Sequence, residues 1–203
     1  THHVAAALVQ TTHDPAAVVA QLSLADRLGH LTTVAPGATV RRMSKPGSDA
    51  VARTIRFLAD HVPTAVVREM TADTSTVQAA ADALGIEPAR IAKTLALRAD
   101  DRAFLVVTSG LARLDNAKFK ARFGAKPRML PPEETTALTG QPVGGVGPFG
   151  HPSPVATYCD VSLRAFDTVF PAAGSRTSAF EISVERLAEL AGAAWVDVCR
   201  LPD

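Results

Sequence analysis

The stretch from Pro142 to Pro154 constrains the fold of this chain more than any other part of its sequence. It holds four glycines and four prolines within thirteen residues. Proline lacks a backbone donor and fixes φ, and glycine weakens a helix or strand that contains it, so neither element can run through this stretch. The sequence therefore predicts a long irregular segment, residues 139–154, between two groups of regular elements.

The same stretch contains a glycine pattern, residues 145–150, that matches the letters of the dinucleotide-binding fingerprint. That fingerprint requires a strand before the first glycine and a helix that begins within the motif. Pro142 closely precedes the pattern, and Pro152 and Pro154 follow it, which no helix tolerates. A dinucleotide site is therefore disfavoured. A plain connecting loop and a ligand-binding loop both stay open, and the density of glycine and proline favours the second.

Composition narrows the class of protein. The chain has 203 residues, of which 47% are hydrophobic and 20% charged, as expected for one globular domain with or without an appendage. Its longest apolar run, Val4 to Val9, is too short to span a membrane, and the beginning of the sequence does not resemble a secretory signal. Two cysteines exclude a four-cysteine zinc site. We expect a cytoplasmic protein with no metal and no cofactor.

The pattern of elements divides the chain in two. Residues 1–49 are expected to form an extension with one helix, Asp14 to Leu28, and a linker, and residues 50–203 a second domain. The second domain mixes short helices with strands, which predicts an α+β fold on a mixed sheet. The expected helices are 51–61, 75–85, 115–124, 184–191 and one that begins at 131; the expected strands are 65–67, 91–98, 104–108, 155–159, 168–170, 180–182 and 195–198.

Lys93 is a candidate functional residue because of its place in a strand. Alternation puts Lys93 on the same face as Ile91 and Leu95, and a lysine on an aliphatic face must reach solvent, find a partner or serve a site. The sequence alone does not decide between a lysine that reaches round the strand end and a functional one.

The sequence gives little support for a nucleophilic or metal site and some for a local nucleic-acid contact. The chain has no nucleophile elbow and no zinc-protease motif, and a pair of His151 with Cys159 is less favoured than a buried Cys159. The net charge is only +1, so any contact with nucleic acid must come from a local patch. One acid-free run offers such a patch or an ordinary solvated face: Lys118, Lys120, Arg122, Lys126 and Arg128.

From Val51 to Val198 the chain resembles the YbaK/prolyl-tRNA synthetase editing-domain family, the aminoacyl-tRNA deacylases. The resemblance rests on residues 79–85, 91–95, 105–107, 139–151 and 172–175. It implies a mixed-sheet, barrel-like fold with flanking helices. It also implies that Lys93 is the catalytic lysine that contacts the 3′-terminal nucleotide. The substrate-binding residues it implies are Thr94, Gly144, Gly145, Val146, Gly147, Pro148 and Gly174.

The function implied by this resemblance is hydrolysis, in trans, of the ester bond of mischarged aminoacyl-tRNA. Cys-tRNA(Pro) and Ala-tRNA(Pro) are the expected substrates, prolyl-tRNA synthetase is an expected partner, and no membrane or DNA is involved. After Gly174, where several family members have a polar Asp or His, residues 178–180 offer only a serine, which leaves the amino acid open. A non-catalytic module that binds aminoacyl-tRNA or a synthetase is the alternative, and a small-molecule regulator is a weaker one.

Overall fold

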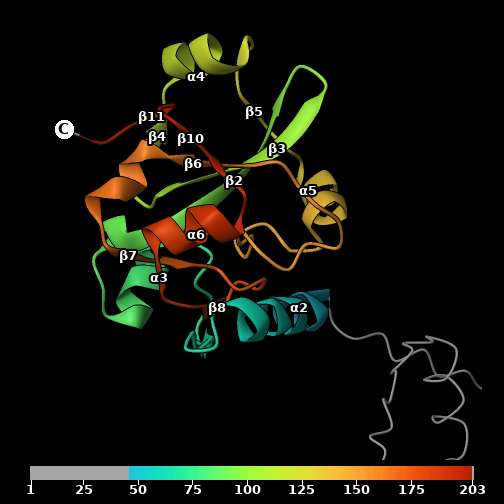
Figure 1. The fold of residues 1–203 in the computed structure, drawn as a ribbon, viewed down its shortest axis with the longest axis vertical. Helices are drawn as coiled ribbons and strands as arrows, with labels where there is room; N and C mark the ends of the chain where they lie inside the picture. The colour runs from blue at the N-terminus through green and yellow to red at the C-terminus, as the bar shows by residue number, and fades with distance from the viewer. Residues whose placement is uncertain (1–45, 203) are drawn as a thin grey trace, which may run out of the picture. The chain divides into compact units, whose positions relative to one another are not determined.

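A computed structural model describes residues 46–202, and Figure 1 shows their fold. The helix expected between Asp14 and Leu28 lies outside the described residues. Helix α2 (Pro46–His61) begins at Pro46 rather than at Val51, since a proline is tolerated in the first turn, where its missing N–H has no helical partner. The expected domain boundary after residue 49 falls inside this helix, and the division of the chain into two domains stays a prediction.

The central sheet is mixed, as the sequence predicted. Its strands follow the order β10 (Ala194–Val196), β6 (Thr157–Asp160), β3 (Arg102–Ser109), β2 (Ile91–Ala99), β7 (Thr168–Pro171), β9 (Ile182–Ser183), and β5 (Arg128–Met129) also pairs with β2. Strand β2 is antiparallel to β3 and parallel to β7, and β6 is parallel to both β3 and β10.

Two short pairs lie beside the sheet. One joins β1 (Arg68–Glu69) to β8 (Ser178–Ala179). The strand expected at residues 65–67 is therefore wrong, because the strand in the structure begins directly after these residues. The other joins β4 (Arg113–Leu114) to β11 (Cys199–Arg200). Each has only two residues per strand, too short for a period-2 pattern to reveal it in the sequence.

The edge of β2 is open along part of its length. Strand β7 pairs with β2 only at Ile91 and Ala92, and β5 pairs with it only at Leu97 and Arg98. No described strand lies beside β2 between these two pairings on that edge, so the sheet leaves space there for a loop and a ligand.

The helices begin and end at the residues that capping chemistry favours. Thr76 caps α3 (Val77–Leu84), one residue after the Ser75 expected to start it, and Asp115 caps α4 (Asn116–Phe123). Both helices end at a glycine with positive φ, as predicted. Helices α5 (Pro132–Thr139) and α6 (Val184–Leu190) and the 3-10 turns η1 (Pro88–Arg90) and η2 (Val161–Ala165) complete the fold. In Figure 1, α4 lies at the opposite end of the molecule from α2.

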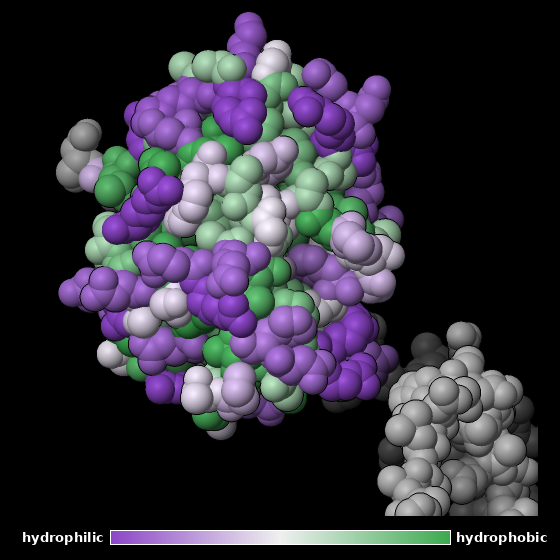
Figure 2. Space-filling view, viewed as in Figure 1, coloured by the Kyte–Doolittle hydropathy of each residue, from purple (hydrophilic) through white to green (hydrophobic). Residues whose placement is uncertain are grey.

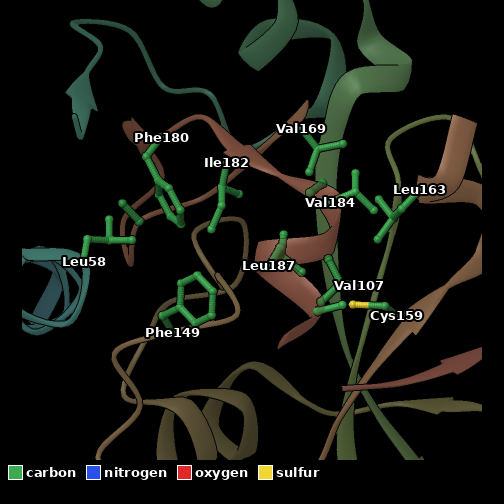
Figure 3. Packing of buried hydrophobic residues seen from close by; sticks show 13 residues of the cluster. Leu58, Val107, Phe149, Cys159, Leu163, Val169, Phe180, Ile182, Val184 and Leu187 are labelled. Carbon is green, nitrogen blue, oxygen red and sulfur yellow. The ribbon is translucent and has the colours of Figure 1, made fainter. Parts of the chain in front are cut away.

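The largest buried cluster joins α2, α6, the sheet and the glycine–proline loop. Figure 3 shows Leu58 of α2, Phe149 of the loop and Phe180 pointing toward one another, and Val107 of β3 beside the sulfur of Cys159. The surface is mixed, with hydrophobic residues scattered among hydrophilic ones in Figure 2. Among the described residues, no helix has the length and apolar character needed to cross a membrane.

Candidate active site

A pocket of about 120 Å³ lies at the open edge of β2. Its wall comes from the start of β2, the glycine–proline loop, the segment before α3 and the turn before β8. Its apolar lining includes four alanines, Ala80, Ala92, Ala172 and Ala179. The larger apolar side chains are those of Met70, Val77, Ile91, Val146 and Phe170. Of the predicted site residues, the pocket brings together Lys93, Thr94, Gly144 and Val146.

Lys93 is held by the turn that follows β3. Its Nζ donates to the carbonyl oxygens of Gly110 at 3.0 Å and Ala112 at 2.8 Å. Burial lowers the pKa of Lys93 from its usual value, the nearby Cys199 opposes this, and the positive charge of Arg113 adds to it. Because an ammonium carries three N–H donors and two are engaged, one donor is left for a ligand.

Three further donors at the pocket have no protein acceptor among residues 46–202. The Oγ1 of Thr94 is buried and makes no hydrogen bond there. The backbone amides of Gly144 and Val146 also have no acceptor in this part of the chain, whereas those of Gly145 and Gly147 do. A buried donor without an acceptor costs free energy, so the hydroxyl of Thr94 marks a place where a ligand oxygen would be bound. Gly144 is exposed, so its amide is open to water or to a ligand.

The other predicted loop residues lie off the pocket. A Cβ on Gly145 would overlap the backbone of Ser175, and one on Gly147 would overlap the carbonyl oxygen of Ala172. Gly174 has a φ of +101° and lies against Ala50 of α2, and Pro148 faces a separate hollow beside α2. Contact of these four residues with a substrate stays a prediction, while their packing positions the loop.

Gln141, which the sequence analysis missed, holds this loop together. Its side chain is fully buried; Nε2 donates to the carbonyl of Phe149 at 2.6 Å, and Oε1 accepts from the amide of Gly147 at 2.8 Å. Arg53 of α2 adds a bond from Nε to the carbonyl of Gly150 at 2.8 Å. The only signal in the sequence was a glutamine in front of a glycine-rich stretch, which by itself indicates nothing.

Gly110 was also missed by sequence reasoning. A Cβ there would overlap the carbonyl oxygen of Pro88 and lie 2.7 Å from Val77, so only glycine lets the turn approach η1 and α3 this closely. This approach brings the carbonyl that accepts from Lys93 to the edge of the pocket.

His151 and Cys159 do not form a catalytic pair. His151 Nε2 donates to the carbonyl of Gly147 at 2.9 Å, and burial lowers the pKa of His151. Cys159 is buried in the core, where burial raises its pKa to about 12. A thiol with that pKa is protonated at neutral pH and is not a nucleophile. No group of three or more potential metal ligands occurs in the described part of the chain.

The predicted basic run lies on and after α4, with Phe119 and Phe123 buried beneath it. All five cations are exposed, but two of them already have partners. Lys118 pairs with Asp197 at 2.7 Å, and the guanidinium of Arg122 lies over the rings of Phe123 and Tyr158. Binding of tRNA by Lys118, Lys120, Arg122, Lys126 and Arg128 stays a prediction.

Two known proteins are similar in sequence to this chain. "Uncharacterized protein YwhH" of Bacillus subtilis (strain 168) is 44% identical over 136 residues, which cover 66% of this chain and 87% of that protein. A proline–tRNA ligase of Solidesulfovibrio magneticus is 40% identical over 90 residues, which are 43% of this chain and 15% of the ligase.

A solved structure has the same fold. It is titled "Crystal structure of a putative trans-editing enzyme for prolyl tRNA synthetase" and superposes with a TM-score of 0.69 at 33% identity, covering 74% of this chain and 97% of that one. A family profile described as the aminoacyl-tRNA editing domain matches residues 71–190, which include every residue that lines the pocket except Met70. The resemblance inferred from the sequence and the α+β mixed-sheet fold are thereby confirmed. The chain belongs to the aminoacyl-tRNA editing domain family.

Proposed function

We propose that this protein hydrolyses, in trans, the ester bond of mischarged tRNA(Pro) that carries cysteine or alanine. The observation that carries the proposal is the convergence, at one small pocket, of Lys93 with three donors that have no acceptor among the described residues. The similarity to a proline–tRNA ligase and to a structure titled as a trans-editing enzyme supports tRNA(Pro) as the carrier.

Hydrolysis of an aminoacyl ester needs little from the protein beyond orientation and charge stabilisation. Water adds to the ester carbonyl carbon, the bond from that carbon to the ribose oxygen breaks, and the ribose oxygen takes up a proton. Negative charge develops on the carbonyl oxygen as water adds. The amides of Gly144 and Val146 and the hydroxyl of Thr94 are fixed donors for that oxygen, and the remaining N–H of Lys93 is free for the terminal nucleotide.

The size of the pocket supports a small amino acid. Its alanine side chains and its volume of about 120 Å³ leave room for a methyl or thiol-bearing side chain beside the ester. A synthetase pocket shaped for proline cannot strongly exclude smaller amino acids, because one methylene is worth only about 1–3 kcal/mol in binding. A second pocket that hydrolyses the smaller product removes these errors.

Two substitutions test the chemistry against tRNAs charged with cysteine, alanine and proline. Lys93→Ala should reduce the rate constant of deacylation at least tenfold, about 1.4 kcal/mol of transition-state stabilisation. Thr94→Val removes only the hydroxyl and should also slow deacylation without lowering the melting temperature. The matched control is Thr136→Val on the exposed face of α5, which should leave the rate unchanged.

Two results would contradict the proposal. If the wild-type protein binds charged tRNA but hydrolyses none of the three esters, it is a non-catalytic binding module. If Lys93→Ala keeps both full activity and full stability, the lysine is only a strand residue that reaches the turn after β3.

A further inference from the structure

The short ribbon of β4 and β11 places two arginines opposite each other. Arg113 and Arg200 are cross-strand partners, both exposed, and neither forms a salt bridge with any described residue. Like charges directly opposite on an antiparallel pair are destabilising. The arrangement therefore costs stability unless an anion lies between the two guanidinium groups.

A second cross-strand pair shows how this cost is normally relieved. Arg98 and Arg128 are also directly opposite, and there Arg98 bonds to Glu134 at 2.6 Å. The ribbon has no such acid. Its neighbour Asp197 is paired with Lys118 on α4.

The other acid near the ribbon is engaged as well. Asp115 caps α4, and its Oδ1 accepts from the amides of Ala117 at 2.9 Å and Lys118 at 3.0 Å. These bonds hold the pKa of Asp115 below its usual value, with smaller contributions from Arg200 and Lys118. No salt bridge joins Asp115 to Arg113 or Arg200 in the described part of the chain, so the charge of Asp115 only partly offsets that of Arg200, and neither guanidinium is held by an acid.

The ribbon follows directly after the turn that contacts Lys93 of the pocket. Lys93 lines the pocket and bonds to the carbonyl of Ala112, the residue before Arg113. Leu111, two residues before Arg113 in the same turn, is 42% exposed. An exposed apolar side chain in the turn that leads to the two arginines suits a nucleoside joined to a phosphate better than it suits a free anion.

We propose that Arg113 and Arg200 together bind one backbone phosphate of the single-stranded 3′ end of tRNA, adjacent to the terminal nucleotide whose ester occupies the pocket. The identity of the RNA rests on the proposed function. The phosphate bridges the two guanidinium groups and relieves their repulsion, so the pair is a positioning site for the RNA strand and not part of the hydrolytic chemistry.

The test measures binding of an uncharged RNA hairpin with a single-stranded 3′-CCA end, and of the same hairpin without that end. Arg113→Gln combined with Arg200→Gln should weaken binding of the CCA-ended hairpin about tenfold at 0.1 M salt, about 1.4 kcal/mol. The slope of log K against log salt should become shallower by about 0.7, the value for one phosphate contact on a single strand. Binding of the blunt hairpin should not change.

The matched control is Arg56→Glu, which alters the net charge by the same two units as the double substitution. Arg56 is exposed on α2, and Figure 1 shows α2 at the opposite end of the molecule from β4 and β11. This variant should keep both the affinity and the salt slope of the wild type. An equal loss in Arg56→Glu would show that net charge alone acts, and would overturn the proposal.

Two more results would overturn it. One is an unchanged affinity in the double variant whose melting temperature is intact. The other is complete displacement of the RNA from the wild type by millimolar inorganic phosphate, which would make the pair a site for free phosphate. Because the RNA is uncharged, these outcomes do not depend on hydrolysis; failure of deacylation alone would contradict the proposed function and leave the phosphate site standing.

Discussion

Gln141 is the residue whose replacement tests the architecture of the loop most directly. Its amide bridges the loop from the inside: one end donates to the carbonyl of Phe149, and the other accepts from the amide of Gly147. Substitution by methionine nearly preserves volume and so creates little cavity. It leaves the amide of Gly147 without a partner, and it leaves the carbonyl of Phe149 with only the longer bond from Thr54 Oγ1 at 3.4 Å.

The expected cost follows from the Gly147 amide. A buried donor left unsatisfied costs about 1–3 kcal/mol, so Gln141→Met should lower the free energy of unfolding by at least about 1–3 kcal/mol. Against a total of about 5–15 kcal/mol for a typical domain, this is a large fraction. The loss should appear as a lower urea midpoint with an unchanged m-value, because the surface exposed on unfolding stays the same.

The matched control makes the same substitution on the surface. Gln78 is exposed on α3, and its Nε2 donates to Asp82 at 2.8 Å. Such a pair contributes about 0.2–0.5 kcal/mol, so Gln78→Met should shift the midpoint only slightly. If Gln141→Met costs no more than Gln78→Met, the loop is not held by its buried glutamine and the reasoning fails.

Three further predictions rest on neighbouring contacts. Gln141→Glu places a carboxylate against the carbonyl of Phe149, so burial should raise the pKa of the new acid. Urea unfolding at several pH values should show that the variant gains stability relative to the wild type as pH falls below that pKa. Gly147→Ala should lower the unfolding free energy by about 1–3 kcal/mol, because its methyl group would overlap the carbonyl of Ala172; equal stability would contradict the packing argument. The folded-state pKa of His151 is lowered, so its neutral form is favoured and the free energy of unfolding should fall as pH drops below about 6.5. His151→Gln should reduce this pH dependence of stability, and a variant with the same pH dependence as the wild type would show that other groups cause it.

Most of the elements could be predicted because their signals are local. Asp115 and Gly124 mark the two ends of α4 within the sequence itself, and proline and glycine define the irregular segment. The short strands could not be predicted, since β4 and β11 form only when Arg113 and Arg200 meet from distant parts of the chain. A two-residue strand is created by its partner and not by its own propensity.

The site was predicted in part for the same reason. The strand pattern singled out Lys93, and the resemblance added Thr94 and the loop, all of which can be read along the chain. Gln141 acts through Gly147 and Phe149, six and eight residues away across a folded loop, so no linear spacing reveals it. Gly110 likewise matters because of Pro88 and Val77, which only the fold brings to it.

The loop can offer a substrate only those amides that it does not use itself. The amide of Gly145 donates to the carbonyl of Pro142, and the amide of Gly147 donates to Gln141. The amides of the two alternate residues, Gly144 and Val146, have no acceptor within residues 46–202. Absence of a side chain at Gly145 and Gly147 lets the backbone lie directly against Ala172 and Ser175, which fixes these two residues in the interior. Because these two amides are already bonded, the amides without an acceptor are the alternate ones, those of Gly144 and Val146. Under the proposed function these are the donors for the ester, and the glycines that pack against protein hold the loop without lining the pocket themselves.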